Sequence, residues 1–275
     1  MSLSKKETMA EIVRCGKDPS FFCKKYAKIS HPMKGLIPFD LYDFQSEALL
    51  EFRDHRFNVI LKARQLGIST TVAAYVCWLM LFHRDKNVLV VATKLGTATN
   101  LVKKIKAIHR HLPPWLKIAE ISIDNRQSFE LSNGSQVKAS STSGDAGRSE
   151  ALSLLVVDEA AFVEGMEELW AGLYPTLSTG GRCIALSTPN GVGNWFHKTY
   201  TEAEEEKNDF HTIRLPWEVH PERDQAWFEK ETRNMSRREI AQELECNFNA
   251  SGETVIHGDD LKRILEATRD PSHQA

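Results

Sequence analysis

The sequence predicts an α/β fold in which a mainly parallel β-sheet is flanked by helices. Apolar runs of strand length at 57–63, 87–93 and 152–160 alternate with segments whose apolar residues recur at helical spacing. Strands that are apolar on both faces and alternate with helices are typical of a parallel sheet covered on both sides. The chain has 275 residues, of which 41% are hydrophobic, so it is long enough for one large domain of this class.

Three regions are expected along the chain. Residues 1–55 are interrupted by two X-Pro pairs before residue 40, which predicts short helices and loops in a small N-terminal helical subdomain. Residues 56–250 hold the alternating strands and helices and form the core. Residues 251–275 have weak apolar content, which predicts the start of a linker to a further domain.

Each element of the core has its own signal in the sequence. Apolar strands are expected at 57–63, 87–93, 152–160, 182–191 and 210–215. Asn133-Gly134 is a typical two-residue turn and predicts a hairpin over 128–141. Apolar residues at helical spacing predict helices at 42–53, 69–82, 97–111, 165–173, 194–207, 225–233 and 237–246.

Composition and charge exclude several classes of protein. The net charge of −2 gives no global basic field, so a nucleic-acid partner would be held by local patches or by several subunits together. The five cysteines are scattered, which argues against a structural zinc or a disulfide framework and suits a reducing compartment; Cys77 and Cys183 are expected in the core. The longest apolar stretch, 72–82, is shorter than the ~20 residues that span a bilayer, so a soluble protein is expected.

The segment KARQLGIST at 62–70 lies between the first apolar strand and its helix. It matches the phosphate loop G-x-x-x-x-G-K-[ST] at Gly67 and Ser69, but Ile68 stands at the usual lysine position and Lys62 at that of the first glycine. A lysine at the front of the loop can still reach the β- and γ-phosphates, and the N–H groups at the helix start would face phosphate oxygens. The alternative is an ordinary strand–turn–helix that binds no phosphate.

Two acids, Asp158 and Glu159, end the apolar strand LLVVDE. Asp158 could hold Mg²⁺ directly or through water, with Ser69 as a hydroxyl ligand. Glu159 could polarise the attacking water as a general base. Two acids at a strand end can also simply cap the next helix. Because both motifs occur in the expected strand context, they predict an ATP-hydrolysing P-loop NTPase fold of the ASCE type, with ATP and Mg²⁺ as cofactors.

An aromatic and a carboxamide precede the loop in LYDFQ at 41–45. Gln45 could read the adenine edge with its paired donor and acceptor, while Tyr42 or Phe44 stacks on the base. An amphipathic helix start accounts for the same residues. The region 1–55 is therefore expected to contribute to adenine binding.

Polar residues and arginines complete the predicted site. Ser187, Thr188 and Asn190 follow a buried strand, where they could sense the γ-phosphate and couple its loss to movement, although a simple turn is the alternative. Arg148 follows a Gly-containing stretch and suits a charge-stabilising arginine finger, acting in cis or on a neighbouring subunit. Arg64, inside the loop, is a rival for that role.

Together these motifs resemble the large terminase subunit of tailed bacteriophages. The lysine-first loop, the NGS hairpin, the Gly-Arg loop, the VVDEA strand and the STPNG turn match the order of its ATPase domain over about residues 40–250. The resemblance implies a motor in the host cell cytoplasm that hydrolyses ATP to thread double-stranded DNA into a procapsid. It also implies a homo-oligomeric ring on the portal, a small terminase subunit as partner, and no membrane association.

The resemblance also assigns roles by position. Asp158 and Ser69 would bind the metal, Glu159 would be the catalytic carboxylate, and Arg148 would act between subunits. Arg64 would respond to the γ-phosphate, and residues 187–190 would couple hydrolysis to motion. The nucleotide contacts are expected from Lys62, Arg64, Gln65, Gly67, Ile68, Ser69, Thr70, Gln45 and Tyr42.

Two alternative functions stay open. A helicase-like nucleic-acid translocase needs the same loop lysine, acid pair and coupling turn, and a nucleotide-binding scaffold without hydrolysis would account for Ile68. Full-length terminase large subunits carry a C-terminal nuclease domain with an acidic metal cluster. Asp259-Asp260 lies in a polar tail that does not resemble such a cluster, so no nuclease activity is expected from this chain.

Positive charge concentrates on the helix expected at 97–111, and a solvated helix face is favoured over a DNA contact. Its basic residues are Lys103, Lys104, Lys106, His109, Arg110 and His111.

Overall fold

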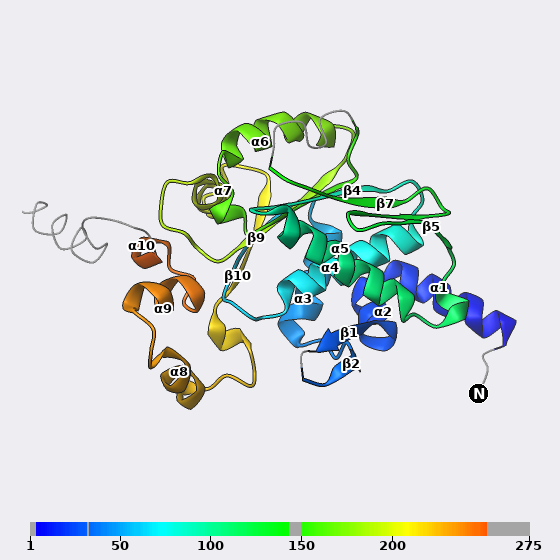
Figure 1. Ribbon diagram of the computed structural model, residues 1–275, viewed down its shortest axis with the longest axis horizontal. Coiled ribbons are helices and arrows are strands. Elements are labelled where there is room, and N and C mark those ends of the chain that lie inside the picture. The colour runs from blue at the N-terminus through cyan, green and yellow to red at the C-terminus, as the bar shows by residue number, and fades with distance from the viewer. Residues whose placement is uncertain (1–3, 32, 143–149, 252–275) are drawn as a thin grey trace, which may run out of the picture.

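The computed structural model describes residues 4–31, 33–142 and 150–251. Its centre is an eight-stranded sheet with the strand order β10-β3-β9-β8-β4-β7-β6-β5 (Figure 1). The six strands from β10 to β7 are parallel, and the last two pairs are antiparallel. The strands are β3 (Phe57–Lys62), β4 (Asn87–Ala92), β5 (Ile121–Asp124), β6 (Ser128–Leu131), β7 (Gln136–Ser140), β8 (Leu154–Asp158), β9 (Arg182–Ser187) and β10 (Phe210–Leu215).

Helices cover both faces of this sheet. In Figure 1, α6 (Met166–Leu173) and α7 (Trp195–Glu204) lie above it, and α3 (Asp43–Asp54), α4 (Ile68–Phe82) and α5 (Leu95–Arg110) lie below. The strands alternate accordingly, because successive side chains point to opposite faces. In β8, Leu154 and Val156 join the core beside α4 and α5, whereas Leu155 and Val157 join the core beside α6 and α7. The predicted fold class is confirmed.

The N-terminal region shares a core with the sheet domain. Here α1 (Lys5–Lys17) and α2 (Pro19–Tyr26) pack on α4, where the Trp78 indole N–H donates to the Cys15 carbonyl at 2.8 Å. The prediction of helices and loops missed a hairpin, β1 (Lys28–His31) with β2 (Gly35–Pro38), because four-residue strands carry too short an alternation to be read. The boundary at residue 55 stays a prediction.

Most predicted elements are observed within a few residues of their expected bounds. The hairpin at 128–141 is confirmed as β6 and β7, while the exposed strand β5 beside it was missed because its apolar residues face solvent. Cys77 and Cys183 are buried as expected. The C-terminal part adds α8 (Gln225–Thr232), α9 (Arg237–Glu243) and α10 (Phe248–Ser251). None of the helices in the described ranges combines the length and apolar character needed to cross a bilayer.

Candidate functional site

The sheet register brings three predicted site residues to one edge. Leu61 of β3 pairs with Ser187 of β9, and Leu186 of β9 pairs with Asp158 of β8. Lys62, Ser187 and Asp158 therefore end three consecutive parallel strands at the same level. Ligands of open α/β sheets bind at this carboxyl edge.

A cleft of about 730 Å³ opens at this edge, which is a usual size for a small-molecule site. It is lined by residues from both predicted motifs and from α5 and α9. The lining includes Lys62, Arg64, Ser69, Thr93, Lys104, Asp158, Glu159, Thr188 and Glu243.

The loop between β3 and α4 begins this site. Gly67 caps α4 with a left-handed backbone (φ +74°), and its carbonyl accepts from the Thr70 and Thr71 N–H groups. A Cβ at Gly67 would lie 2.7 Å from Gln45 Nε2, so a larger residue would both strain the backbone and clash. The helix therefore starts with its N-terminal end facing the cleft, where anions are favoured.

Asp158 is 6% exposed and lies against the start of α4. Burial raises the pKa of its carboxyl, while the nearby Lys62 and a hydrogen bond with Ser69 oppose that shift. A buried carboxylate beside a hydroxyl is a pair of hard oxygen donors of the kind that Mg²⁺ prefers. The structure thus brings together the two residues predicted to hold the metal.

Lys62 ends β3 among three carboxylates. Desolvation lowers the pKa of its ammonium, and Asp158, Glu159 and Glu243 oppose that shift. A lysine in this position can present a point charge to phosphate oxygens from the front of the loop.

Glu159 has a strained backbone. Its φ of 57° places a non-glycine residue in the left-handed region, which L-residues rarely adopt. The carboxylate accepts a hydrogen bond of 2.8 Å from Thr93 Oγ1, at the end of β4. Such outliers cluster at active sites, and this one turns the Glu159 side chain into the cleft rather than into a helix cap.

The polar turn after β9 is bonded to the acidic segment. Ser187 Oγ accepts from the Ala161 N–H at 3.2 Å, and Asn190 Nδ2 donates to the Ala161 carbonyl at 3.2 Å. Thr188 lines the cleft itself. A shift of Glu159 can therefore be transmitted to the turn through Ala161, two residues further along the chain.

The C-terminal helices hold the loop from outside. Arg64 is exposed over 68% of its side chain and forms an ion pair of 3.0 Å with Glu243, whose carbonyl also accepts the Arg64 backbone N–H at 2.7 Å. Arg223 donates to the carbonyls of Arg64 and Gln65 at 3.2 and 3.0 Å. Sequence analysis missed Glu243 and Arg223, since nothing in their local pattern connects them to a loop more than 150 residues away.

Three predicted nucleotide contacts serve the protein's own structure here. Gln45 is buried; its Nε2 donates to the Leu66 carbonyl at 2.9 Å and its Oε1 accepts from the Tyr42 N–H at 3.2 Å. The Tyr42 ring stacks on Phe44 with centroids 5.7 Å apart. Ile68 is 1% exposed and belongs to the core, so only its backbone faces the loop. The adenine-reading role of Gln45 and Tyr42 stays a prediction.

Lys104 of α5 was missed as a site residue. Its ammonium donates to Thr70 Oγ1 at 3.1 Å and lines the cleft, where desolvation lowers its pKa, Asp158 opposes the shift and Lys62 adds to it. The sequence placed it on a solvated basic face. That expectation is also wrong for Lys106, which pairs with Asp124 at 2.9 Å, and for His109; these side chains are 6% and 2% exposed.

Arg148 lies outside the described residues, so its role as an arginine finger stays a prediction.

Residues 59–263 match the family described as terminase large subunit, T4likevirus type, N-terminal. A protein of Escherichia phage Mu, described as a probable large terminase subunit, is 31% identical over 140 aligned residues that cover 43% of this chain and 24% of the Mu protein.

Solved structures with a similar fold are also large terminases. The ATPase domain from Thermus phage P74-26 superimposes with a TM-score of 0.59 at 19% identity, over 73% of this chain and 92% of that domain. The HK97 bacteriophage large terminase gives 0.62 at 17% identity, over 94% and 52%. A large terminase from another thermophilic bacteriophage, in complex with ADP, gives 0.60 at 14% identity, over 76% and 54%. The matched part of this chain thus spans about half of the two whole terminases and about a quarter of the Mu protein.

Proposed function

Because this chain belongs to the terminase large subunit family, we propose that it hydrolyses ATP to drive double-stranded DNA into a viral procapsid. The observation that carries the ATPase reading is the convergence of Lys62, Ser69, Asp158 and Glu159 on one cleft at the carboxyl edge of the sheet. The ADP complex of the similar terminase from a thermophilic bacteriophage supports a nucleotide at this edge.

Each side chain then has a role that follows from its position. Lys62 and the N-terminal end of α4 bind the β- and γ-phosphates of ATP. Asp158 and Ser69 are the oxygen ligands for Mg²⁺, which, when bound, neutralises charge on the phosphate oxygens. Glu159 accepts a proton from the attacking water, held in place by Thr93.

A second lysine adds to the phosphate end of the site. Lys104 approaches the loop from α5 and contacts Thr70, on the helix that follows Gly67. Since Ile68 is packed in the core, Lys104 supplies a positive charge that the loop itself lacks after Gly67. It would stabilise the negative charge that develops on the transferred phosphoryl group.

Coupling to movement would run through Ala161. Loss of the γ-phosphate frees the Glu159 side chain to move, and Ser187 and Asn190 are bonded to the residue two positions further on. Arg64 can report the same event to α9, because it pairs with Glu243. Arg148 remains our candidate for a finger that acts on a neighbouring subunit of a ring.

The test is phosphate release by the purified chain at high concentration with Mg²⁺. Lys62→Ala and Glu159→Gln should each lower kcat by about 100-fold or more, because each removes a group that acts in the transition state. Lys103→Ala, an exposed neighbour of Lys104, is the matched control and should retain wild-type turnover. Equal activity of all four proteins would contradict the assigned site. If all four are inactive even with procapsids, the chain is a nucleotide-binding scaffold.

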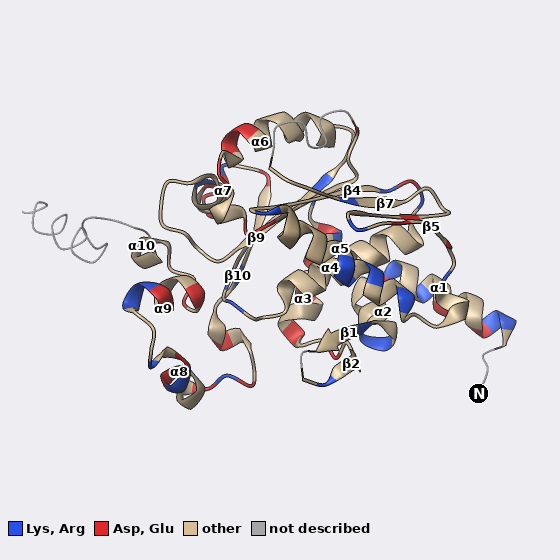
Figure 2. Ribbon diagram, in the orientation of Figure 1, with Lys and Arg blue, Asp and Glu red and all other residues tan. Residues whose placement is uncertain are grey.

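DNA contact is expected to require several subunits. Figure 2 shows Lys and Arg interspersed with Asp and Glu along the ribbon, consistent with the net charge of −2. A single chain should therefore bind DNA weakly and with strong dependence on salt. Separation of a forked duplex without procapsids would instead favour the helicase-like alternative. Cleavage of plasmid DNA by the chain with Mg²⁺ or Mn²⁺ would contradict our expectation that it lacks nuclease activity.

A further inference from the structure

Three side chains with metal-binding atoms meet at the amino edge of the sheet, opposite the phosphate loop. Glu51 and His55 are four residues apart at the end of α3, and His211 is the second residue of β10. Their ligand atoms all lie within 4.8 Å of one another. Both imidazole Nε2 atoms approach the same carboxylate oxygen of Glu51, His55 at 3.0 Å and His211 at 2.9 Å.

The two imidazole rings are held parallel. Their centroids are 3.8 Å apart and their planes differ by 8°, so the Nε2 atoms point the same way, toward Glu51. A nitrogen pair at such a spacing, with an oxygen about 3 Å from each, approximates one face of a tetrahedron around a small cation. Ligands at about 2.0–2.1 Å from a central ion lie a little over 3 Å from each other in that geometry.

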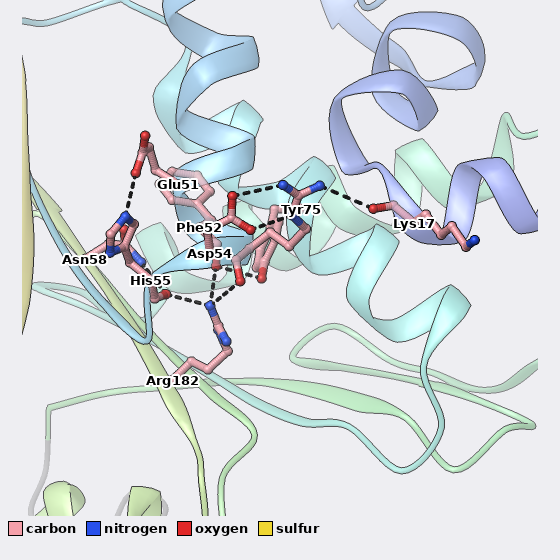
Figure 3. A network of polar contacts seen from close by, with 9 residues as sticks. Lys17, Glu51, Phe52, Asp54, His55, Asn58, Tyr75 and Arg182 are labelled. Carbon is pink, nitrogen blue, oxygen red and sulfur yellow. Dashed lines mark hydrogen bonds and ion pairs between the residues drawn. The ribbon is translucent and has the colours of Figure 1, made fainter.

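The surrounding backbone fixes these ligands. His211 pairs with Asn58 of β3, and Asn58 Nδ2 donates to the His55 carbonyl at 3.1 Å. Arg182 donates to the carbonyls of His55 and Phe52 at 2.6 and 2.9 Å, which closes the end of α3 (Figure 3). These bonds hold the ligands before any ion arrives, as the outer contacts of metal sites do.

We propose that Glu51, His55 and His211 bind a divalent transition-metal ion of the Zn²⁺ class. Two imidazoles and one carboxylate suit Zn²⁺, Co²⁺ or Ni²⁺, whereas Mg²⁺ and Ca²⁺ prefer all-oxygen sites. Three protein ligands leave one tetrahedral position for water. The alternative is a plain network in which the carboxylate accepts from two neutral imidazoles.

Binding would join the end of α3 to the edge strand β10. Edge strands are held on one side only, so a link at the start of β10 stabilises an otherwise one-sided pairing. The far end of β10 also matters, since the Leu215 carbonyl accepts from the Ala63 N–H, the first residue of the phosphate loop, at 2.7 Å. The site itself is separate from the proposed nucleotide cleft and does not depend on the proposed function.

The test uses the whole chain, freed of metal by a chelator. Titration with Zn²⁺ should give one site per chain, and a hundredfold excess over Kd should raise Tm by roughly 5 °C. Co²⁺ in place of Zn²⁺ should give visible absorption bands of a bound, low-coordinate ion. The same concentration of Mg²⁺ should not reproduce the shift in Tm.

Variants separate this site from other thiols and histidines. His211→Gln and Glu51→Gln should each remove the Zn²⁺-dependent rise in Tm and weaken binding at least tenfold, while phosphate release without Zn²⁺ stays at its wild-type rate. His111→Ala, exposed on another part of the chain, should keep both. Circular dichroism of each variant verifies folding. Absence of Zn²⁺ binding by the wild type, or an equal Tm rise in His211→Gln and Glu51→Gln, overturns the proposal.

Discussion

The left-handed backbone at Glu159 predicts an inverted order of stability for two substitutions. Glu159→Ala and Glu159→Gly both remove the carboxylate and its bond to Thr93, so these losses cancel in the comparison. A left-handed conformation costs an L-residue roughly 1–2 kcal/mol, and glycine almost nothing. Glycine in turn loses about 0.5–1 kcal/mol more backbone entropy on folding than alanine. The glycine variant should therefore be more stable by about 0.5–1 kcal/mol, the reverse of the usual order.

The assay is urea unfolding of both variants without nucleotide, with phosphate release measured in parallel. Glu206 has a similar left-handed φ of 56° but lies exposed and away from the cleft, so its Ala and Gly variants form a matched control. The Glu206 pair should show the same order of stability with wild-type turnover, whereas both Glu159 variants should lose turnover. If Glu159→Ala is as stable as Glu159→Gly while the Glu206 pair behaves as expected, the strained backbone at Glu159 is refuted.

Three further outcomes follow from the site. Lys104→Ala should lower phosphate release by about tenfold, less than Lys62→Ala, because Lys104 adds to a charge already present; turnover equal to that of Lys103→Ala would contradict this role. Ile68→Ala should lower the free energy of unfolding by about 2–5 kcal/mol and Ile68→Val by about 0.5–1.5, since the side chain is buried. Turnover of folded Ile68→Val should stay near wild type, and its loss would indicate a phosphate contact. Because burial raises the pKa of Asp158, hydrolysis should decline as pH falls through that raised pKa, where a proton replaces Mg²⁺. Higher Mg²⁺ should move the decline to lower pH, and a pH profile that ignores Mg²⁺ would argue against Asp158 as the ligand.

The sequence was sufficient for the class of fold and for the principal residues of the site. Buried parallel strands are continuous apolar runs, and each motif residue follows such a run directly, so Lys62, Ser69, Asp158 and Glu159 could be placed on strand ends without coordinates. The same local reading failed for β1, β2 and β5. Their short strands are paired by neighbours rather than specified by their own pattern.

Only the tertiary structure decided which distant residues complete the sites. The order of parallel strands depends on how the crossover helices pack, so no local pattern reveals that β9 lies between β3 and β8. That order brings the turn after β9 onto Ala161, and the packing of α5 and α9 brings Lys104 and Glu243 to the cleft. His211 likewise meets Glu51 only because β10 returns beside β3. The sequence determined which groups end the strands, and long-range packing determined which other groups face them.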